Sequence, residues 1–386
     1  MNVALKHWRE SATLILAAGH RLGADSLPSR TPLASGRGGS HLQHRCRFDY
    51  DVLMLKRSGK SGFMPNAYVF PGGVVDSSDF SNDWLDVFKP FTNSPNFGLR
   101  SVKQPRDTRP PIFATDRLKL GSPIPGEVAL RICALRETFE ESGVLLVVPK
   151  KEEKKLFKSF EETWGTPHYT EPELSGSELT KWRALVNQNP SNFVRMCREL
   201  EVLPNIWALH EWANWLTPKG RYGKTRFDTA FFICCLQDTP HTLQDEREIE
   251  RFQWSAPSEV LRSYQGRELW IAPPQFYELS RMCRLTSLTD LHGFAHQRAA
   301  EGCEQWLPVV VSTDEHYTTL LPGDTFYPPD TSEQAEADTT TDAQLKEPQD
   351  GSALHRIVMS DPFTITVQIT ITPKYNHLLP VVEPAL

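Results

Sequence analysis

No stretch of the sequence is apolar for long enough to cross a membrane. The longest apolar run, residues 12–19, is far shorter than the ~20 residues that a spanning helix needs, which excludes an integral membrane protein. None of the seven cysteines lies in a Cys-x-x-Cys pair, so a zinc ribbon or a disulfide framework is disfavoured and a reducing compartment is expected. The sequence also has no internal repeats, and its 30 prolines disfavour a long helical array.

Outside one segment the chain has little net charge. The formal net charge is -6, but residues 324–350 alone carry eight acidic residues and one lysine, so the remainder of the chain sums to +1. A nearly neutral body offers no basic stripe for a long nucleic acid, which is therefore not an expected partner. The acidic segment itself is interpreted as a solvated loop.

The hydrophobic pattern predicts strands interspersed with helices. A helix is expected at residues 127–142, where apolar side chains mix with helix formers and Gly143 stands at the end. Polar helices are expected within residues 150–200, a helix starting near Ser258, and an amphipathic helix at residues 287–307. The expected strands lie at residues 12–18, 50–55, 67–70, 144–148, 212–216, 227–236, 250–254, 309–311, 318–321, 357–359 and 364–372.

Three carboxylates share one face of the first of these helices. Glu137, Glu140 and Glu141 fall at i, i+3 and i+4 near its C-terminal end, where like charges repel one another and oppose the helix dipole. Such a cluster is best tolerated when a cation lies among the acids, and carboxylate oxygens suit Mg²⁺ or Mn²⁺. Arg136 lies at i−4 from Glu140 and can orient the cluster. The alternative is an ordinary solvated helix face, but the pattern Arg-Glu-x-x-Glu-Glu-x-Gly is too specific to favour it.

Residues 136–144 (RETFEESGV) resemble the core of the Nudix box, the signature of the Nudix hydrolase superfamily. The full box reads Gly-x5-Glu-x7-Arg-Glu-U-x-Glu-Glu-x-Gly-U, where U is aliphatic, and Thr138 departs from it at the first U position. The resemblance implies an α/β/α sandwich around a mixed sheet, a divalent cation, and hydrolysis of a nucleoside diphosphate linked to another group.

The first half of the box is displaced along the chain. Ser122 and Val128 stand at the spacings where the box has its glycine and its first glutamate. The glycine that fits is Gly73, which ends the sequence Phe-Pro-Gly-Gly and is separated from Arg136 by 62 residues rather than 13. Most of the 74–126 stretch is therefore an insertion within the box. Glu127, one residue too early, is a candidate for the missing glutamate.

A box divided in this way resembles the animal acyl-coenzyme A diphosphatase branch of the superfamily. The resemblance extends to PNIWALHEWANWLTP, RFDTAFFICCL, QWSAPSE, PPQFYEL and LPGD, at residues 204–218, 226–236, 253–259, 273–279 and 321–324. It implies a Nudix domain at residues 1–270 and a small α+β extension at residues 271–386. Insertions are expected near residues 20–47, 74–126 and 150–203, and the acidic loop at residues 324–352.

The implied reaction is hydrolysis of the pyrophosphate of coenzyme A or its thioesters, which gives adenosine 3',5'-bisphosphate and (acyl-)4'-phosphopantetheine. The metal ligands implied for Mg²⁺ or Mn²⁺ are Glu137 and Glu141, with Glu140 beside them and the Gly73 carbonyl as a further ligand. Arg136 belongs to the same catalytic group. Two or three cations of this kind would clamp a pyrophosphate while an activated water attacks in line.

Further site residues are implied outside the box. Glu248 is the expected distal acid, as a ligand or general base, with Glu246 and Glu250 as alternatives. The phosphates of coenzyme A need cationic partners. Three candidates follow the second strand: Arg57, Lys56 and Lys60. The fourth is Arg226 at the start of RFDTAFF, and the other basic residues of 219–226 are alternatives to it. Three tryptophans could stack on adenine, but positions in the core or at a subunit interface are expected for them: Trp207, Trp212 and Trp215. A structural role is expected for His210.

Two other functions stay open. The substrate could be another diphosphate, such as ADP-ribose, a nucleotide sugar or a capped RNA end, or the chain could be a non-catalytic coenzyme A-binding module. The intact acidic pattern argues against loss of activity. The branch implies a peroxisomal location, although Pro384-Ala385-Leu386 lacks the basic middle residue of an S-K-L-type signal, and the basic residues 1–47 leave the mitochondrion as the alternative. A homo-oligomer is possible.

Overall fold

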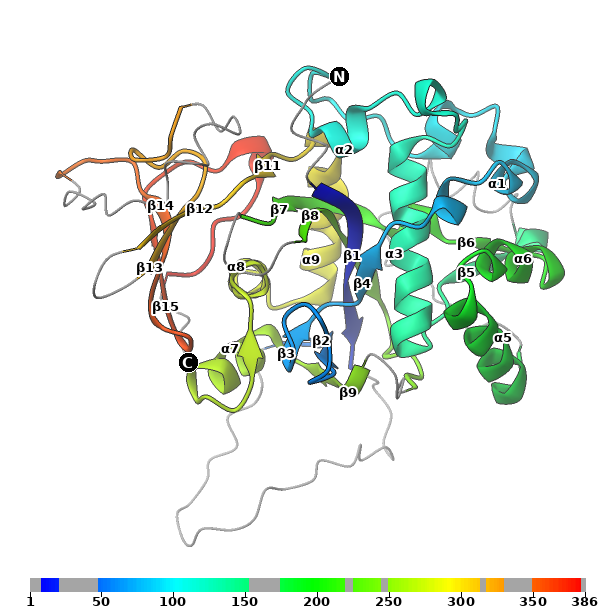
Figure 1. Ribbon diagram of the computed structural model, residues 1–386, viewed down its shortest axis with the longest axis horizontal. Helices are drawn as coiled ribbons and strands as arrows, with labels where there is room; N and C mark the ends of the chain where they lie inside the picture. The colour runs from blue at the N-terminus through cyan, green and yellow to red at the C-terminus, as the bar shows by residue number, and fades with distance from the viewer. Residues whose placement is uncertain are drawn as a thin grey trace, which may run out of the picture.

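The computed structural model describes residues 8–20, 48–152, 174–218, 225–243, 249–312, 317–329 and 349–382. In Figure 1 a central sheet stands between helix α3 (Gly126–Ser142) and helix α9 (Leu288–Arg298). A smaller sheet lies on the side away from α3, beyond helix α8 (Pro273–Met282) and near helix α7 (Pro257–Gln265). This layering confirms the predicted α/β/α sandwich.

The central sheet is mixed, as predicted. Strand β1 (Trp8–Gly19) pairs in parallel with β8 (Arg226–Leu236) along nearly its whole length, and antiparallel with β2 (Tyr50–Arg57). The strand order is β10-β3-β2-β1-β8-β7-β11, with β4 paired to β1 and β9 paired to β2. The remaining strands are β3 (Ala67–Val69), β4 (Gly72–Val74), β7 (His210–Leu216), β9 (Ile249–Ser255), β10 (Trp270–Ile271) and β11 (Gln305–Trp306).

Alternate side chains of β1 enter two separate cores. Leu14 and Leu16 pack in the core that contains α3, whereas Ile15 and Ala17 pack in the core that contains α7, α8 and α9. All four side chains are fully buried. Because successive residues of a strand point to opposite faces, a sheet covered on both faces requires the nearly continuous apolar sequence that this strand has.

The two long insertions contain short elements. Between β4 and α3 lie α1 (Asp83–Val87), α2 (Pro111–Ala114), and the 3-10 turns η2 (Ser77–Phe80), η3 (Lys89–Phe91), η4 (Pro95–Gly98) and η5 (Leu118–Leu120). After α3 come β5 (Val147–Pro149), η6 (Lys150–Glu152), α5 (Gly176–Gln188), α6 (Asn192–Glu199), β6 (Val202–Pro204) and η7 (Ile206–Ala208). The predicted strand at 144–148 is wrong at its start, because residues 144–146 are buried in the α3 core and only β5 pairs with β6. None of the described helices has the length and apolarity that a membrane span requires.

The smaller sheet contains β12 (Val309–Ser312), β13 (Tyr317–Leu320), β14 (His355–Asp361) and β15 (Thr364–Ile369), all antiparallel. The η9 turn (Lys374–Asn376) follows it. The predicted helix at 287–307 ends early: α9 stops at Arg298, η8 (Ala299–Glu301) follows, and Gly302 at φ +93 turns the chain into β11. Left-handed backbone of this kind favours glycine and terminates helical structure. The acidic residues 330–348 lie outside the described residues.

Candidate active site

The acidic face of α3 lies at the C-terminal end of the helix, where Gly143 adopts φ +74 and donates its N–H to the Phe139 carbonyl. A residue with left-handed backbone cannot continue an α-helix, so α3 ends at Ser142. The side chains of Glu137 and Glu140 are each 15% exposed, and Glu141 is buried. The three carboxylates therefore lie at the boundary between the core and a cavity.

Arg136 connects two of these glutamates to a further acid. One guanidinium nitrogen, Nη1, donates to Oε1 of Glu137 and to Oε1 of Glu140, both at 2.8 Å. The Nε and Nη2 atoms donate to the two oxygens of Asp79 at 2.8 and 2.9 Å. Arg136 and Asp79 are almost completely buried, so each of the two charges depends on the other for its stabilisation.

Asp79 is a site residue that is missing from the predictions. The signal for it is nevertheless present in the sequence, because five residues separate Gly73 from Asp79, which is the spacing between the glycine and the first glutamate of the box. The turn η2 places its side chain, and the backbone N–H of the N-cap residue Asp76 donates to Oδ2 of Asp79 at 2.9 Å. An aspartate thus occupies the position at which the box has its glutamate.

Glu127 does not replace that glutamate. It lies in the first turn of α3, ten residues and about 15 Å of helix from Glu137. Its carboxylate accepts a 2.6 Å hydrogen bond from Arg109, which also bonds Glu211 on β7 at 2.9 Å. Arg109 therefore ties the insertion to α3 through Glu127 and to the central sheet through Glu211.

Strand β4 brings its main chain against the carboxylates. A Cβ atom on Gly73 would lie 2.4 Å from the carboxylate carbon of Glu137 and 2.5 Å from both of its oxygens, so a residue with a side chain cannot stand there without displacing Glu137. The N–H of Gly72 donates to Oε2 of Glu141 at 2.9 Å. The structure thus brings Glu137 and Glu141, two of the three predicted metal-site glutamates, together with Gly73.

The cluster holds more negative than positive charge. Burial raises the pKa of Glu137 to about 7, with Glu140 adding to the rise and Arg136 opposing it. A cation would relieve this cost, and the carboxylate and carbonyl oxygens present are hard donors that fit Mg²⁺ or Mn²⁺. Within the described residues, no group of three His, Cys, Asp or Glu side chains is already arranged around one ion position. Arg136 instead holds one oxygen each of Glu137 and Glu140.

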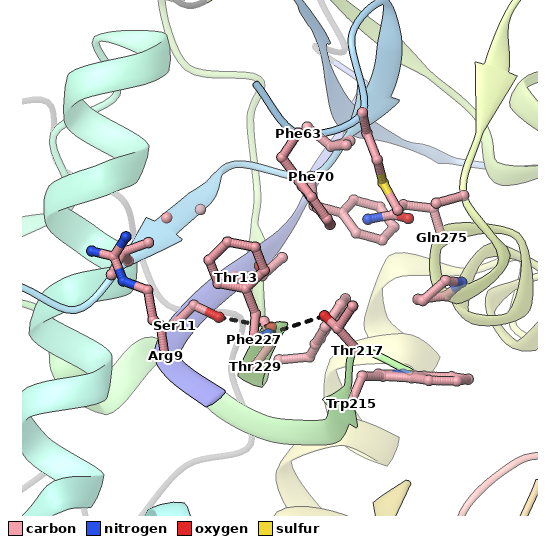
Figure 2. Close-up of a pocket in the computed structure, with 18 of the residues that line it drawn as sticks. Arg9, Ser11, Thr13, Phe63, Phe70, Trp215, Thr217, Phe227, Thr229 and Gln275 are labelled. Atoms are coloured by element: carbon pink, nitrogen blue, oxygen red, sulfur yellow. Dashed lines mark hydrogen bonds between the residues drawn. The ribbon is translucent and has the colours of Figure 1, made fainter. Parts of the chain in front are cut away.

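A cavity of about 610 Å³ opens beside the acidic cluster (Figure 2). Its floor is the face of β1 and β8 that carries Ser11, Thr13 and Thr229. The hydroxyl oxygens of Ser11 and Thr229 lie 2.7 Å apart, and Oγ1 of Thr217 accepts from the N–H of Phe227 at 3.1 Å. In Figure 2 these hydroxyl groups lie between Arg9, which is on the side of α3, and Gln275, which is on the opposite side of the cavity.

The part of the cavity away from the carboxylates is apolar. We call it the apolar chamber and define it by Phe63, Phe70, Trp215, Phe231, Pro274 and Ile357. The smaller sheet and the segment before it contribute to its wall: Pro308, Val310, Thr319 and Ile357. These wall residues are absent from the predictions, because no local pattern connects them with an acidic helix far away in the chain.

The predicted substrate-binding cations are not gathered in one place. Arg57 lines the cavity, and its guanidinium donates to Oγ of Ser61 and to the carbonyl of Phe63. Lys56 forms a 2.9 Å ion pair with Glu250, one of the alternatives for the distal acid. The two other cations do not line the cavity: Lys60 is exposed, and the Arg226 guanidinium lies 3.8 Å from the ring centre of Trp8. Glu248 and Glu246 lie outside the described residues.

The three tryptophans considered for adenine stacking have mainly structural surroundings. Trp212 is fully buried, and Trp207 packs on Phe91 with ring centres 4.5 Å apart. Trp215 does line the cavity, and its indole N–H donates to Glu278 at 2.8 Å. His210 is half-buried, its ring lies beside those of His292 and His296, and burial lowers its pKa well below the ordinary value.

The comparison with protein families agrees with the resemblance of residues 136–144 to the Nudix box. The family model described as the NUDT19 Nudix domain matches residues 8–282, which makes the chain a Nudix hydrolase family member. The model described as the NUDT19 C-terminal domain matches residues 310–370, so within the Nudix hydrolases the chain belongs to the NUDT19 family. The predicted division of the chain at residue 270 stays a prediction.

Relatives of this family match over nearly the full chain. The acyl-coenzyme A diphosphatase NUDT19 of Xenopus laevis is 47% identical over 386 residues, covering 98% of this chain and 97% of its own. The protein of the same name from Homo sapiens is 41% identical over 377 residues, covering 97% of this chain and 94% of its own. Among solved structures, the crystal structure of a NUDIX hydrolase from Alicyclobacillus acidocaldarius has 19% identity and a TM-score of 0.46, covering 77% of this chain and 97% of that one.

Proposed function

We propose that this protein hydrolyses the pyrophosphate bond of coenzyme A and acyl-coenzyme A esters, giving adenosine 3',5'-bisphosphate and (acyl-)4'-phosphopantetheine. The observation that carries the proposal is the cavity of about 610 Å³ that joins three helix glutamates to an apolar chamber. A substrate with a diphosphate at its centre and an uncharged arm suits such a cavity. The relatives named acyl-coenzyme A diphosphatase support the same substrate.

The proposed metal ligands are Glu137, Glu140, Glu141 and the Gly73 carbonyl, with Mg²⁺ or Mn²⁺ as the ion. A bound divalent cation neutralises diphosphate charge and generates a nucleophile from water near neutral pH. Arg136 orients Glu137 and Glu140 by bonding one oxygen of each. The N–H of Gly72 holds Glu141 in the same way. Arg136 thus acts as a positioning residue in this proposal.

The proposed roles outside the acidic cluster follow the sequence. Glu248 is the proposed distal acid. Among the proposed substrate cations, Arg57 is supported by its place in the cavity lining, and Arg9, which was not predicted, lines the cavity as well. For the compartment we propose the peroxisome, with the mitochondrion as the alternative. A fluorescent protein inserted within the chain, so that both ends stay free, tests this location when it is imaged with markers of the two organelles.

A substrate panel tests the reaction. Coenzyme A, dodecanoyl-coenzyme A, ADP-ribose and a capped RNA are incubated with the full chain in Mg²⁺ and in Mn²⁺, and the products are identified by mass spectrometry. We expect the highest kcat/KM for the two coenzyme A compounds, with adenosine 3',5'-bisphosphate as their shared product. Faster cleavage of capped RNA or ADP-ribose would refute the substrate, and coenzyme A binding without turnover in either metal would instead support a binding module.

A further inference from the structure

We propose that the smaller sheet is part of the substrate site, and that the apolar chamber binds the pantetheine arm of the substrate together with its acyl group. The inference rests on the proposed function and assigns the residues that determine its acyl specificity. The apolar chamber and the acidic cluster line the same cavity, so one extended molecule can reach both. Ile357 and Thr319 are the residues that we assign to chain-length selection.

The strand register places a row of three side chains on this wall. Val310 on β12 pairs with Thr319 on β13, and Thr319 pairs with Ile357 on β14. Directly paired residues of neighbouring strands present their side chains on the same face of a sheet. All three line the cavity, and Ile357 is fully buried. The width of the chamber therefore depends on one residue from each of three strands. None of these three strands carries a residue of the acidic cluster.

The charges of the lining favour the uncharged arm as the occupant. The lining residues from α8 and from the smaller sheet include no Lys or Arg among those that the structure describes. Of the three lining arginines, Arg136 bonds the acidic cluster, Arg9 lies on the side of α3 (Figure 2), and Arg57 donates to Ser61 and to the carbonyl of Phe63 at the end of the chamber formed by the β2–β3 segment. The 3'-phosphate of coenzyme A needs cationic partners, so the nucleotide half does not suit the wall formed by α8 and the smaller sheet.

Gln275, in the first turn of α8, provides a polar group in the cavity lining. The residue is 9% exposed, it lines the cavity, and its Oε1 has no hydrogen-bond partner among the described residues. A buried acceptor without a partner is costly, and a ligand N–H removes that cost. The pantetheine arm carries two amide N–H groups, which gives this acceptor a partner. In Figure 2 Gln275 lies across the cavity from Arg9, with the hydroxyl groups of Ser11 and Thr217 between them.

Narrowing and widening the chamber tests the proposal. Ile357→Trp and Thr319→Trp reduce its width, and Ile357→Ala increases it. Thr366→Trp on β15 is the matched control, because Thr366 is exposed on the same sheet and does not line the cavity. We expect each narrowing variant to lower kcat/KM for dodecanoyl-coenzyme A at least tenfold and to lower kcat/KM for unacylated coenzyme A by a smaller factor, because coenzyme A places only its pantetheine arm in the chamber. Ile357→Ala should shift the preference toward longer acyl chains, and thermal unfolding identifies any variant that fails to fold.

Binding of the two separate products distinguishes the outcomes. In EDTA, isothermal titration calorimetry measures dodecanoyl-4'-phosphopantetheine and adenosine 3',5'-bisphosphate on each variant. We expect the narrowing variants and Gln275→Met to weaken only the pantetheine compound. Weakening of the bisphosphate instead, or no change in any folded variant, would overturn the proposal. If the wild-type chain binds the pantetheine compound in the chamber but hydrolyses no coenzyme A, the proposed function fails and the chamber assignment stands.

Discussion

At the scale of single residues, the site depends on how one guanidinium is shared. Arg136 bonds Asp79 with two nitrogens and divides a third between Glu137 and Glu140, at distances of 2.8 to 2.9 Å. Hydrogen bonds between charged groups are roughly twice as strong as neutral ones. The carboxylates are therefore held in place before any ligand arrives, and Asp79 contributes by fixing Arg136.

Removing Asp79 tests this positioning. We expect Asp79→Ala to lower the free energy of unfolding by about 3–5 kcal/mol, because it leaves Arg136 buried without its main partner. Asp79→Asn should lower kcat about 10- to 100-fold, as is typical for groups that orient metal ligands. Asp79→Glu should restore part of the rate. Denaturant unfolding and steady-state kinetics measure both effects, with the exposed Asp86→Ala as the control.

Glu141→Gln separates chemistry from folding. The amide oxygen of glutamine can still accept the N–H of Gly72, so we expect the fold to be kept. The loss of a carboxylate charge should lower kcat for coenzyme A by orders of magnitude. Circular dichroism and steady-state kinetics follow the two properties, and Glu199→Gln on the surface of α6 serves as the control. Turnover close to that of the wild type would show that Glu141 is not a metal ligand.

At the scale of elements, the site is the contact between the end of α3 and the short strand β4. Gly73→Ala would insert a methyl group where the carboxylate of Glu137 now lies, 2.4–2.5 Å away. We expect a loss of stability of about 1–3 kcal/mol and a large drop in kcat. Gly176→Ala is the matched control, because no described atom beyond its chain neighbours and its own helix backbone lies within 4 Å of the added methyl group. Equal kinetics of both variants would exclude the role of this contact.

Elements with a strong local signal were predictable, and those that depend on distant contacts were not. Helix α3 follows from its helix formers and the glycine at its end, strands β1 and β8 follow from their apolar runs, and the three glutamates follow from helical spacing. Asp79 was hidden because the insertion separates it from Arg136 by 56 residues. The helix at 287–307 was overextended because nothing local shows that residues 305–306 join β7 as strand β11.

At the scale of the whole molecule, the cavity joins parts of the chain from Arg9 to Ile357. Its acidic end was predictable, since a single helix supplies the glutamates. Its apolar wall was not, since the wall exists only when the smaller sheet packs on the core that contains α8. Such packing depends on the register of four strands and on contacts across most of the chain.

The pH dependence of global stability gives a test at the same scale. Burial raises the pKa of Asp228 from 3.8 to about 7, although Asn214 donates a 2.7 Å hydrogen bond to it. Because the native state keeps this proton to a higher pH, the contribution of Asp228 to stability is complete below its ordinary pKa. It is lost as the pH rises to about 7.

Asp228→Asn should remove this contribution. Relative to the wild type, the variant should gain free energy of unfolding between pH 4 and pH 8, by as much as about 4 kcal/mol. Urea unfolding at several pH values measures the difference. A constant difference across this range would contradict the raised pKa.

The ion pair of Arg136 and Asp79 gives the chain an internal counter-charge, so we expect its folding not to require a metal ion. Zinc fingers, by contrast, unfold when their metal is removed. We expect EDTA to lower stability only by the free energy of ion binding, about 2.7 kcal/mol at an ion concentration of 100 Kd, and to leave the protein folded in a thermal unfolding experiment. Unfolding in EDTA would contradict this. In a cell short of divalent ions the enzyme would then persist as an inactive reserve, and its activity would return with the ion, without new synthesis.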